Sequence, residues 1–109
     1  DIKLSEKDRK AIEAAARILR ERFPVERVVL FGSKARGDDD PESDIDLLVL
    51  TTHPASSAEK SAMTDALYDA QLEPGVVISK LLVPLERWEH GYYQILPIRS
   101  EVQRDGVAA

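Results

Sequence analysis

Two short polar segments contain the residues whose types and spacing could do chemistry. The first is Gly32-Ser33, which directly follows an apolar run and precedes residues that can form a helical turn. Such a junction offers backbone N–H groups and the positive end of a helix, and both attract phosphate. Glycine lets a ligand approach the backbone closely, and the serine hydroxyl adds a hydrogen bond. Taken alone, the same junction is also typical of an ordinary strand-to-helix turn.

The second segment is Asp44-Ile45-Asp46, which ten residues separate from Ser33. Alternation along a strand places Asp44 and Asp46 on one face, about 6.5 to 7 Å apart at the backbone. Leu48 and Leu50 share that face, and Ile45, Leu47 and Val49 take the other. Carboxylates this close repel unless a cation lies between them, and oxygen ligands without nearby His or Cys suit Mg²⁺ or Mn²⁺. The alternative is that both aspartates only keep an edge strand soluble.

The remaining residues predict the elements that position these two segments. Apolar spacing and helix-breaking residues predict a first helix, capped by Ser5 and stopped by Pro24, and a second helix over Ser57 to about Leu72. They also predict strands over Val25–Phe31, Asp44–Leu50 and Val76–Val83, and a short helix over Ile98–Arg104. A turn or short helix at Gly32–Gly37 and a polar loop at Asp38–Ser43 complete the pattern. We expect one layered α/β domain over residues 1–109 with a small sheet.

Composition excludes several classes of function. Fifteen basic against twenty acidic residues give a net charge of −5, which disfavours direct nucleic-acid binding as the main role. The longest apolar runs, such as Val28–Phe31, are four residues, so no membrane helix is expected. The chain has no cysteine, which excludes disulfides and zinc–thiolate sites and suits a reducing cytoplasm.

Together, the Gly-Ser turn and the Asp-x-Asp strand resemble the minimal nucleotidyltransferases of the DNA polymerase β superfamily. The resemblance covers Phe31–Leu50 closely, and the flanking elements fit that family's layout. It implies an α/β (α+β) nucleotidyltransferase fold, a small mixed β-sheet flanked by helices. It also implies that Gly32 and Ser33 hold the β- and γ-phosphates of ATP or another nucleoside triphosphate. Asp44 and Asp46 would bind Mg²⁺ or Mn²⁺ while a hydroxyl attacks the α-phosphate and releases pyrophosphate.

The same resemblance implies a protein partner. Small stand-alone members of the family are commonly paired with a HEPN-domain ribonuclease as antitoxin and toxin, and some place AMP on a tyrosine of that partner. The expected function is therefore an adenylyltransferase acting on a HEPN protein, in a homo- or hetero-oligomer. The alternative is a weak or inactive transferase fold that neutralises the HEPN protein by binding. Transfer to a small antibiotic is a third, less favoured reading.

The sequence departs from the family pattern at the third carboxylate. The strand predicted at Val76–Val83 contains no acid, and Ser79 stands near the expected place. Asp69 and Glu73 lie just upstream and are assigned to the helix end and the turn. Two carboxylates can still hold a nucleotide-bound metal, whereas a second metal would be held weakly. Nucleotide binding is therefore better supported than fast catalysis.

Other residues have less specific expectations. Arg36 could contact a phosphate or pair with the acids of Asp38–Asp40, and Lys34 is expected to face solvent. His53 and His90 are expected at the surface. Trp88, Tyr92 and Tyr93 are expected to make core or partner contacts, and we place a partner interface within His90–Ala109.

Overall fold

The computed structural model describes residues 4–72 and 75–109. Its elements follow in the order α1 (Glu6–Arg22), β1 (Val25–Phe31), α2 (Ser33–Arg36), β2 (Ile45–Thr51), α3 (Ser57–Leu72), β3 (Ile78–Pro84), α4 (Leu85–His90), the 3₁₀ helix η1 (Tyr92–Ile95), α5 (Pro97–Asp105) and β4 (Val107–Ala108).

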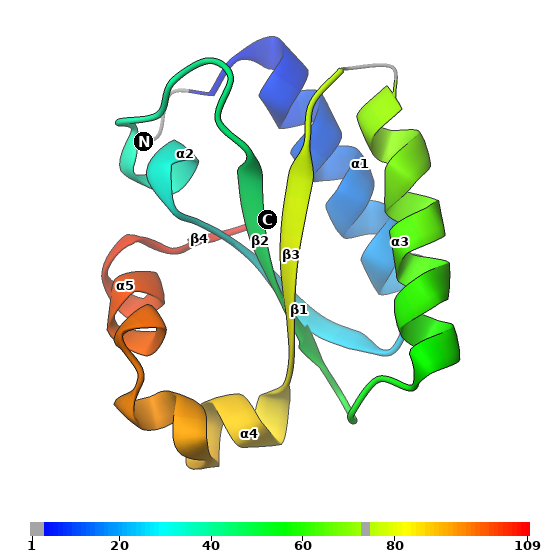
Figure 1. The fold of residues 1–109 in the computed structure, drawn as a ribbon, viewed down its shortest axis with the longest axis vertical. Helices are drawn as coiled ribbons and strands as arrows, with labels where there is room; N and C mark the ends of the chain where they lie inside the picture. The colour runs from blue at the N-terminus through cyan, green and yellow to red at the C-terminus, as the bar shows by residue number, and fades with distance from the viewer. Residues whose placement is uncertain (1–3, 73–74) are drawn as a thin grey trace.

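The strands form one four-stranded sheet in the order β3-β2-β1-β4. Strand β1 is antiparallel to both β2 and β4, and β2 is parallel to β3, so the sheet is mixed. Helices α1 and α3 lie side by side on one face, and α4 and α5 lie on the other (Figure 1). This arrangement confirms the predicted mixed sheet flanked by helices.

Alternation along β2 divides the core into two clusters. Ile45, Leu47 and Val49 pack in a cluster with α1 and α3, whereas Leu48 and Leu50 pack with Trp88, Ile98 and Val102 of α4 and α5. All five β2 side chains are at most 1% exposed. The Leu48 face of β2 is also the face that alternation gives to Asp46. The carboxylate site therefore belongs to the side of the sheet that α4 and α5 cover.

Helix α1 begins as predicted. The Ser5 hydroxyl accepts a hydrogen bond from the backbone N–H of Asp8 at 3.1 Å, which satisfies one of the donors left free at a helix start. The helix ends at Arg22, just before Pro24. Its buried residues include Ala15, Ala16 and Leu19, and they pack against the sheet.

The chain beyond residue 75 is more ordered than the sequence predicts. Strand β3 begins at Ile78 rather than Val76, and α4 and η1 occupy a stretch for which no element was predicted. Strand β4 was also missed, because a two-residue strand shows no apolar alternation of its own and forms only by pairing with Val29 and Leu30 of β1. None of the helices in the described ranges is long and apolar enough to cross a membrane.

Candidate functional site

The turn after β1 has the backbone geometry that the sequence predicted. Gly32 takes φ of +78°, which favours glycine, and α2 follows over four residues. The amides of Ala35 and Arg36 donate to the Gly32 carbonyl at 3.1 Å. The amides of Ser33 and Lys34 open the helix and have no acceptor within it. These two N–H groups, with the Ser33 hydroxyl, are available to an anion.

The turn and the Asp-x-Asp strand touch each other directly. Phe31 is paired with Asp46 in the antiparallel register of β1 and β2, which sets Gly32 beside the Asp46 side chain. A Cβ atom at position 32 would lie 3.2 Å from Asp46 Cγ and would collide with Asp46 Oδ2. Only glycine leaves room for that carboxylate. The structure thus brings the two halves of the sequence motif into contact.

Asp44 and Asp46 place two carboxylates close together, with Arg36 as a nearby cation. Asp44 is exposed at the start of β2, and Asp46 is half-buried. Burial, and then the negative charges of Asp44 and Glu101, raise the pKa of Asp46, while Arg36 acts in the opposite direction. A half-buried carboxylate with a raised pKa beside a second carboxylate fits a divalent cation with oxygen ligands.

The third carboxylate of the family pattern has no counterpart on β3. Ser79 pairs directly with Asp46 in the parallel register of β2 and β3, so β3 carries a hydroxyl group at the position where the family pattern has an acid. Asp69 is exposed on α3, which packs against the opposite face of the sheet. Glu73 lies outside the described residues. Within the described residues, no group of three His, Cys, Asp or Glu side chains is arranged to hold a metal ion.

Glu101 is the residue at this site that sequence reasoning missed. It lies on α5, and its Oε1 atom is 3.8 Å from Arg36 NH1. Arg36 Nε also donates to Asp38 Oδ2 at 3.2 Å, which is the pairing with Asp38–Asp40 that was one of the two alternatives for Arg36. The i, i+3, i+4 spacing of Ile98, Glu101 and Val102 places these side chains on one helix face. Nothing in the sequence indicated that α5 packs beside the Asp46 end of β2.

The prediction that Lys34 faces solvent was wrong. Its side chain is 1% exposed, and its Nζ atom lies 2.8 Å from Asp8 Oδ2 and 3.0 Å from Asp39 Oδ2. Burial alone would lower the pKa of Lys34, but the hydrogen bonds and charges of Asp8 and Asp39 outweigh it and raise the pKa. The sequence does not indicate this arrangement, because the two acids come from separate parts of the chain. Asp8 belongs to α1, and Asp39 belongs to the loop after α2. Lys34 therefore ties the Gly32–Arg36 turn to both.

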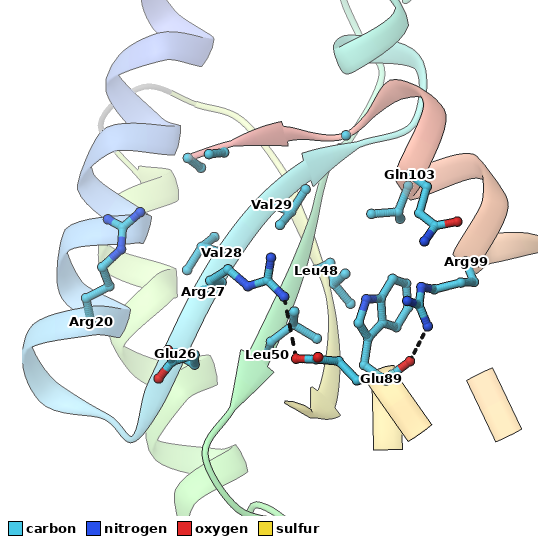
Figure 2. A pocket seen from close by; sticks show the side chains of 15 residues that line it. Arg20, Glu26, Arg27, Val28, Val29, Leu48, Leu50, Glu89, Arg99 and Gln103 are labelled. Carbon is cyan, nitrogen blue, oxygen red and sulfur yellow. Dashed lines mark hydrogen bonds and ion pairs between the residues drawn. The ribbon is translucent and has the colours of Figure 1, made fainter. Parts of the chain in front are cut away.

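A separate cavity of about 410 Å³ lies further along the same face of the sheet (Figure 2). Its walls include Val29, Leu48 and Trp88, and none of Gly32, Ser33, Asp44 and Asp46 lines it. Arg27 and Glu89 form an ion pair of 4.0 Å there, and Arg99 lies over the Trp88 ring.

The other residues weighed from the sequence fall mostly where they were expected. Trp88 is 4% exposed and its ring centre lies 5.9 Å from that of Tyr93, so both belong to the core side. Tyr92 and Ile95 are 67% and 78% exposed and remain available to a partner. His53 and His90 are exposed.

Comparisons with known proteins show which family and which folds this chain resembles. The family model for the nucleotidyltransferase domain matches residues 12–103. A protein of Methanocaldococcus jannaschii named "putative protein adenylyltransferase" is 38% identical over 58 residues, which are 53% of this chain and 59% of that protein. The chain thus matches less than two thirds of that relative's length.

Two solved structures share the fold. A crystal structure of a toxin–antitoxin with AMP-PNP aligns with a TM-score of 0.62 and 17% identity, over 95% of this chain and 72% of that chain. A structure of a "putative nucleotidyltransferase" from Sulfolobus solfataricus aligns with a TM-score of 0.52 and 20% identity, over 97% of this chain and 87% of that one.

Proposed function

Because the chain belongs to the nucleotidyltransferase domain family, we propose that residues 1–109 form one domain that transfers AMP from ATP to a hydroxyl group of a partner protein. The contact between Gly32 and Asp46 carries the proposal. It joins a turn with free backbone amides to a pair of neighbouring carboxylates, and a nucleoside triphosphate with its divalent metal needs both.

In this proposal the residues of the site divide into two roles. The amides of Ser33 and Lys34, the Ser33 hydroxyl and the Arg36 guanidinium hold the β- and γ-phosphates. Asp44 and Asp46 would hold Mg²⁺ or Mn²⁺. When bound there, the ion supplies positive charge against the developing charge on the phosphates. The acceptor oxygen then bonds to the α-phosphorus as the bond to pyrophosphate breaks.

We further propose that the acceptor is a HEPN-domain protein and that the pair acts as antitoxin and toxin in the cytoplasm. The protein named as an adenylyltransferase and the toxin–antitoxin structure support this choice. Tyr92 and Ile95, the exposed apolar side chains of η1, are the surface that we assign to the partner.

A second function is favoured by one specific observation. Ser79 stands opposite Asp46 on β3, where a hydroxyl cannot replace a metal-binding carboxylate. This observation supports a protein that binds ATP but transfers AMP slowly or not at all, and that neutralises its partner by association. Transfer of radioactive AMP from ATP to a co-purified HEPN protein distinguishes the two functions. Labelling supports the enzyme, and neutralisation without labelling supports the binding protein.

Nucleotide binding itself is tested with two glycine variants. Both Gly32 and Gly37 have positive φ, but a Cβ at Gly37 meets nothing within 4 Å whereas one at Gly32 meets Asp46. We expect Gly32→Ala to lose Mg²⁺-dependent binding of an ATP analogue with a non-cleavable α–β bridge in calorimetry. Gly37→Ala should keep that binding and lose about 1–2 kcal/mol of stability, the cost of a left-handed backbone at a residue with a Cβ. Gly32→Ala should lose more stability, because Gly32 has φ of +78° and ψ of −159°, a combination nearly restricted to glycine, and its added Cβ also meets Asp46. Equal affinities in the two variants would contradict the assigned site.

A further inference from the structure

We propose that Glu101 is a positioning residue of the nucleotide site: in the nucleotide-free protein it pairs with the NH1 side of Arg36, whose Nε is bonded to Asp38, and it competes with the triphosphate for that side of the guanidinium group. This inference rests on the proposed function, because it assumes that a triphosphate binds beside Arg36. It adds a residue from α5 to a site whose other members lie between residues 32 and 46.

The position of Glu101 follows from how α5 is anchored. Ile98 and Val102 pack into the cluster around Leu48 and Leu50, and Glu101 projects from the same side of the helix. After α5, strand β4 pairs Val107 with Leu30, near the end of β1. The end of α5 is therefore held close to the turn that begins at Gly32, and Glu101 comes within ion-pair distance of Arg36.

The Arg36–Glu101 contact has the properties of an exchangeable pair. The distance of 3.8 Å is an ion pair without a hydrogen bond, and the two side chains are 35% and 33% exposed. A pair this open to solvent contributes little to stability. Phosphate oxygens accept two parallel hydrogen bonds from a guanidinium group, which is a stronger and more directional contact. A bound triphosphate therefore displaces the Glu101 carboxylate from Arg36.

Displacement has an electrostatic consequence. Arg36 is the cation that counters the negative charges acting on Asp46, and Glu101 is one of those charges. Once Arg36 turns to a phosphate, the Glu101 carboxylate remains near Asp46 and near the phosphates without its partner. Like charges held close in a partly desolvated site repel each other. Glu101 thus weakens nucleotide binding in two ways, by occupying Arg36 and by adding negative charge.

The test is a double-mutant cycle on nucleotide affinity. We expect Glu101→Gln to bind the non-cleavable ATP analogue with Mg²⁺ about three- to fivefold more tightly than the wild-type chain. In the Arg36→Gln background, the gain from Glu101→Gln should fall to less than half. Asp65→Asn, an exposed position on α3, makes the same change in net charge on the opposite side of the sheet and should leave the affinity unchanged.

Each other outcome overturns the inference. An unchanged or weaker affinity of Glu101→Gln, with the wild type binding normally, shows that Glu101 does not compete. An equal gain with and without Arg36 shows that Glu101 does not act through the guanidinium group. If the wild-type chain itself fails to bind the analogue, the proposed function is contradicted. If Gly32→Ala loses binding as expected but Glu101→Gln has the affinity of the wild type, only the role of Glu101 is contradicted.

Discussion

At the scale of single residues, the charge of Asp46, which we propose as a metal ligand, bears on the stability of the protein. Burial, together with Asp44 and Glu101, raises the pKa of Asp46 above its ordinary value of 3.8. The folded protein therefore binds this proton more tightly than the unfolded chain does. Its stability falls as the pH rises from the unfolded pKa through the folded pKa, and the full penalty is present above both.

Removing that charge should therefore stabilise the metal-free protein. We expect Asp46→Asn to melt at a higher temperature than the wild type at pH 7, and the difference should disappear when the pH falls below the ordinary carboxyl range. Addition of Mg²⁺ should raise the melting temperature of the wild type but not of Asp46→Asn, since only the intact pair holds the ion. Thermal melts at several pH values, with and without Mg²⁺, check both results, and a Mg²⁺ effect that survives in the variant would argue against the metal assignment.

At the scale of elements, Lys34 is the residue that joins α1, α2 and the loop before β2. Replacing it with methionine leaves the Asp8 carboxylate, on a residue that is 5% exposed, without its partner. Breaking a buried ion pair in this way costs about 3–5 kcal/mol. We expect urea denaturation to show a loss of this size for Lys34→Met. Lys60→Met, at an exposed position of α3, is the matched control and should change stability by less than about 0.5 kcal/mol. A small effect at Lys34 would mean that Asp8 finds another partner.

The same elements show what the sequence could predict. The strands β1 and β2 and the helices α1 and α3 were predicted because each carries its own apolar periodicity and its own stop signal. The contact of Gly32 with Asp46 depends on the register of β1 with β2, which no local pattern fixes. Only the motif as a whole implied it. The roles of Lys34 and Glu101 depend on partners from distant elements. No local pattern encodes such pairing, so burial of Lys34 and the packing of α5 beside Asp46 became visible only in the folded chain.

At the scale of the whole molecule, the two core clusters share the strands β1, β2 and β3, as consecutive residues of β2 illustrate. Leu47 and Leu48 are consecutive, yet each is completely buried in a different cluster. If one cluster lost its packing, β2 would be displaced, and the packing of the other cluster would be lost with it. We therefore expect a single cooperative unfolding transition, as is usual for chains of this size.

The chain contains one tryptophan, Trp88, and it lies in the cluster of α4 and α5. Its fluorescence reports on that cluster, whereas far-UV circular dichroism is dominated by α1 and α3 on the other face. In urea the midpoints of the two signals should coincide. Separate midpoints would show that the helices on the two faces unfold independently.

The pairing of β4 with β1 also has a consequence for how the protein is made. A ribosome releases residues 25–51 well before residues 97–108, so β1 and β2 can pair, and Gly32 can meet Asp46, while α5 is still being synthesised. The contacts that close the sheet at β4 and bring Glu101 to Arg36 join residues far apart in the chain, and such contacts form late because closing a long loop is slow. The nascent protein therefore forms the contact between Gly32 and Asp46 first, and Glu101 reaches Arg36 only after α5 has been made.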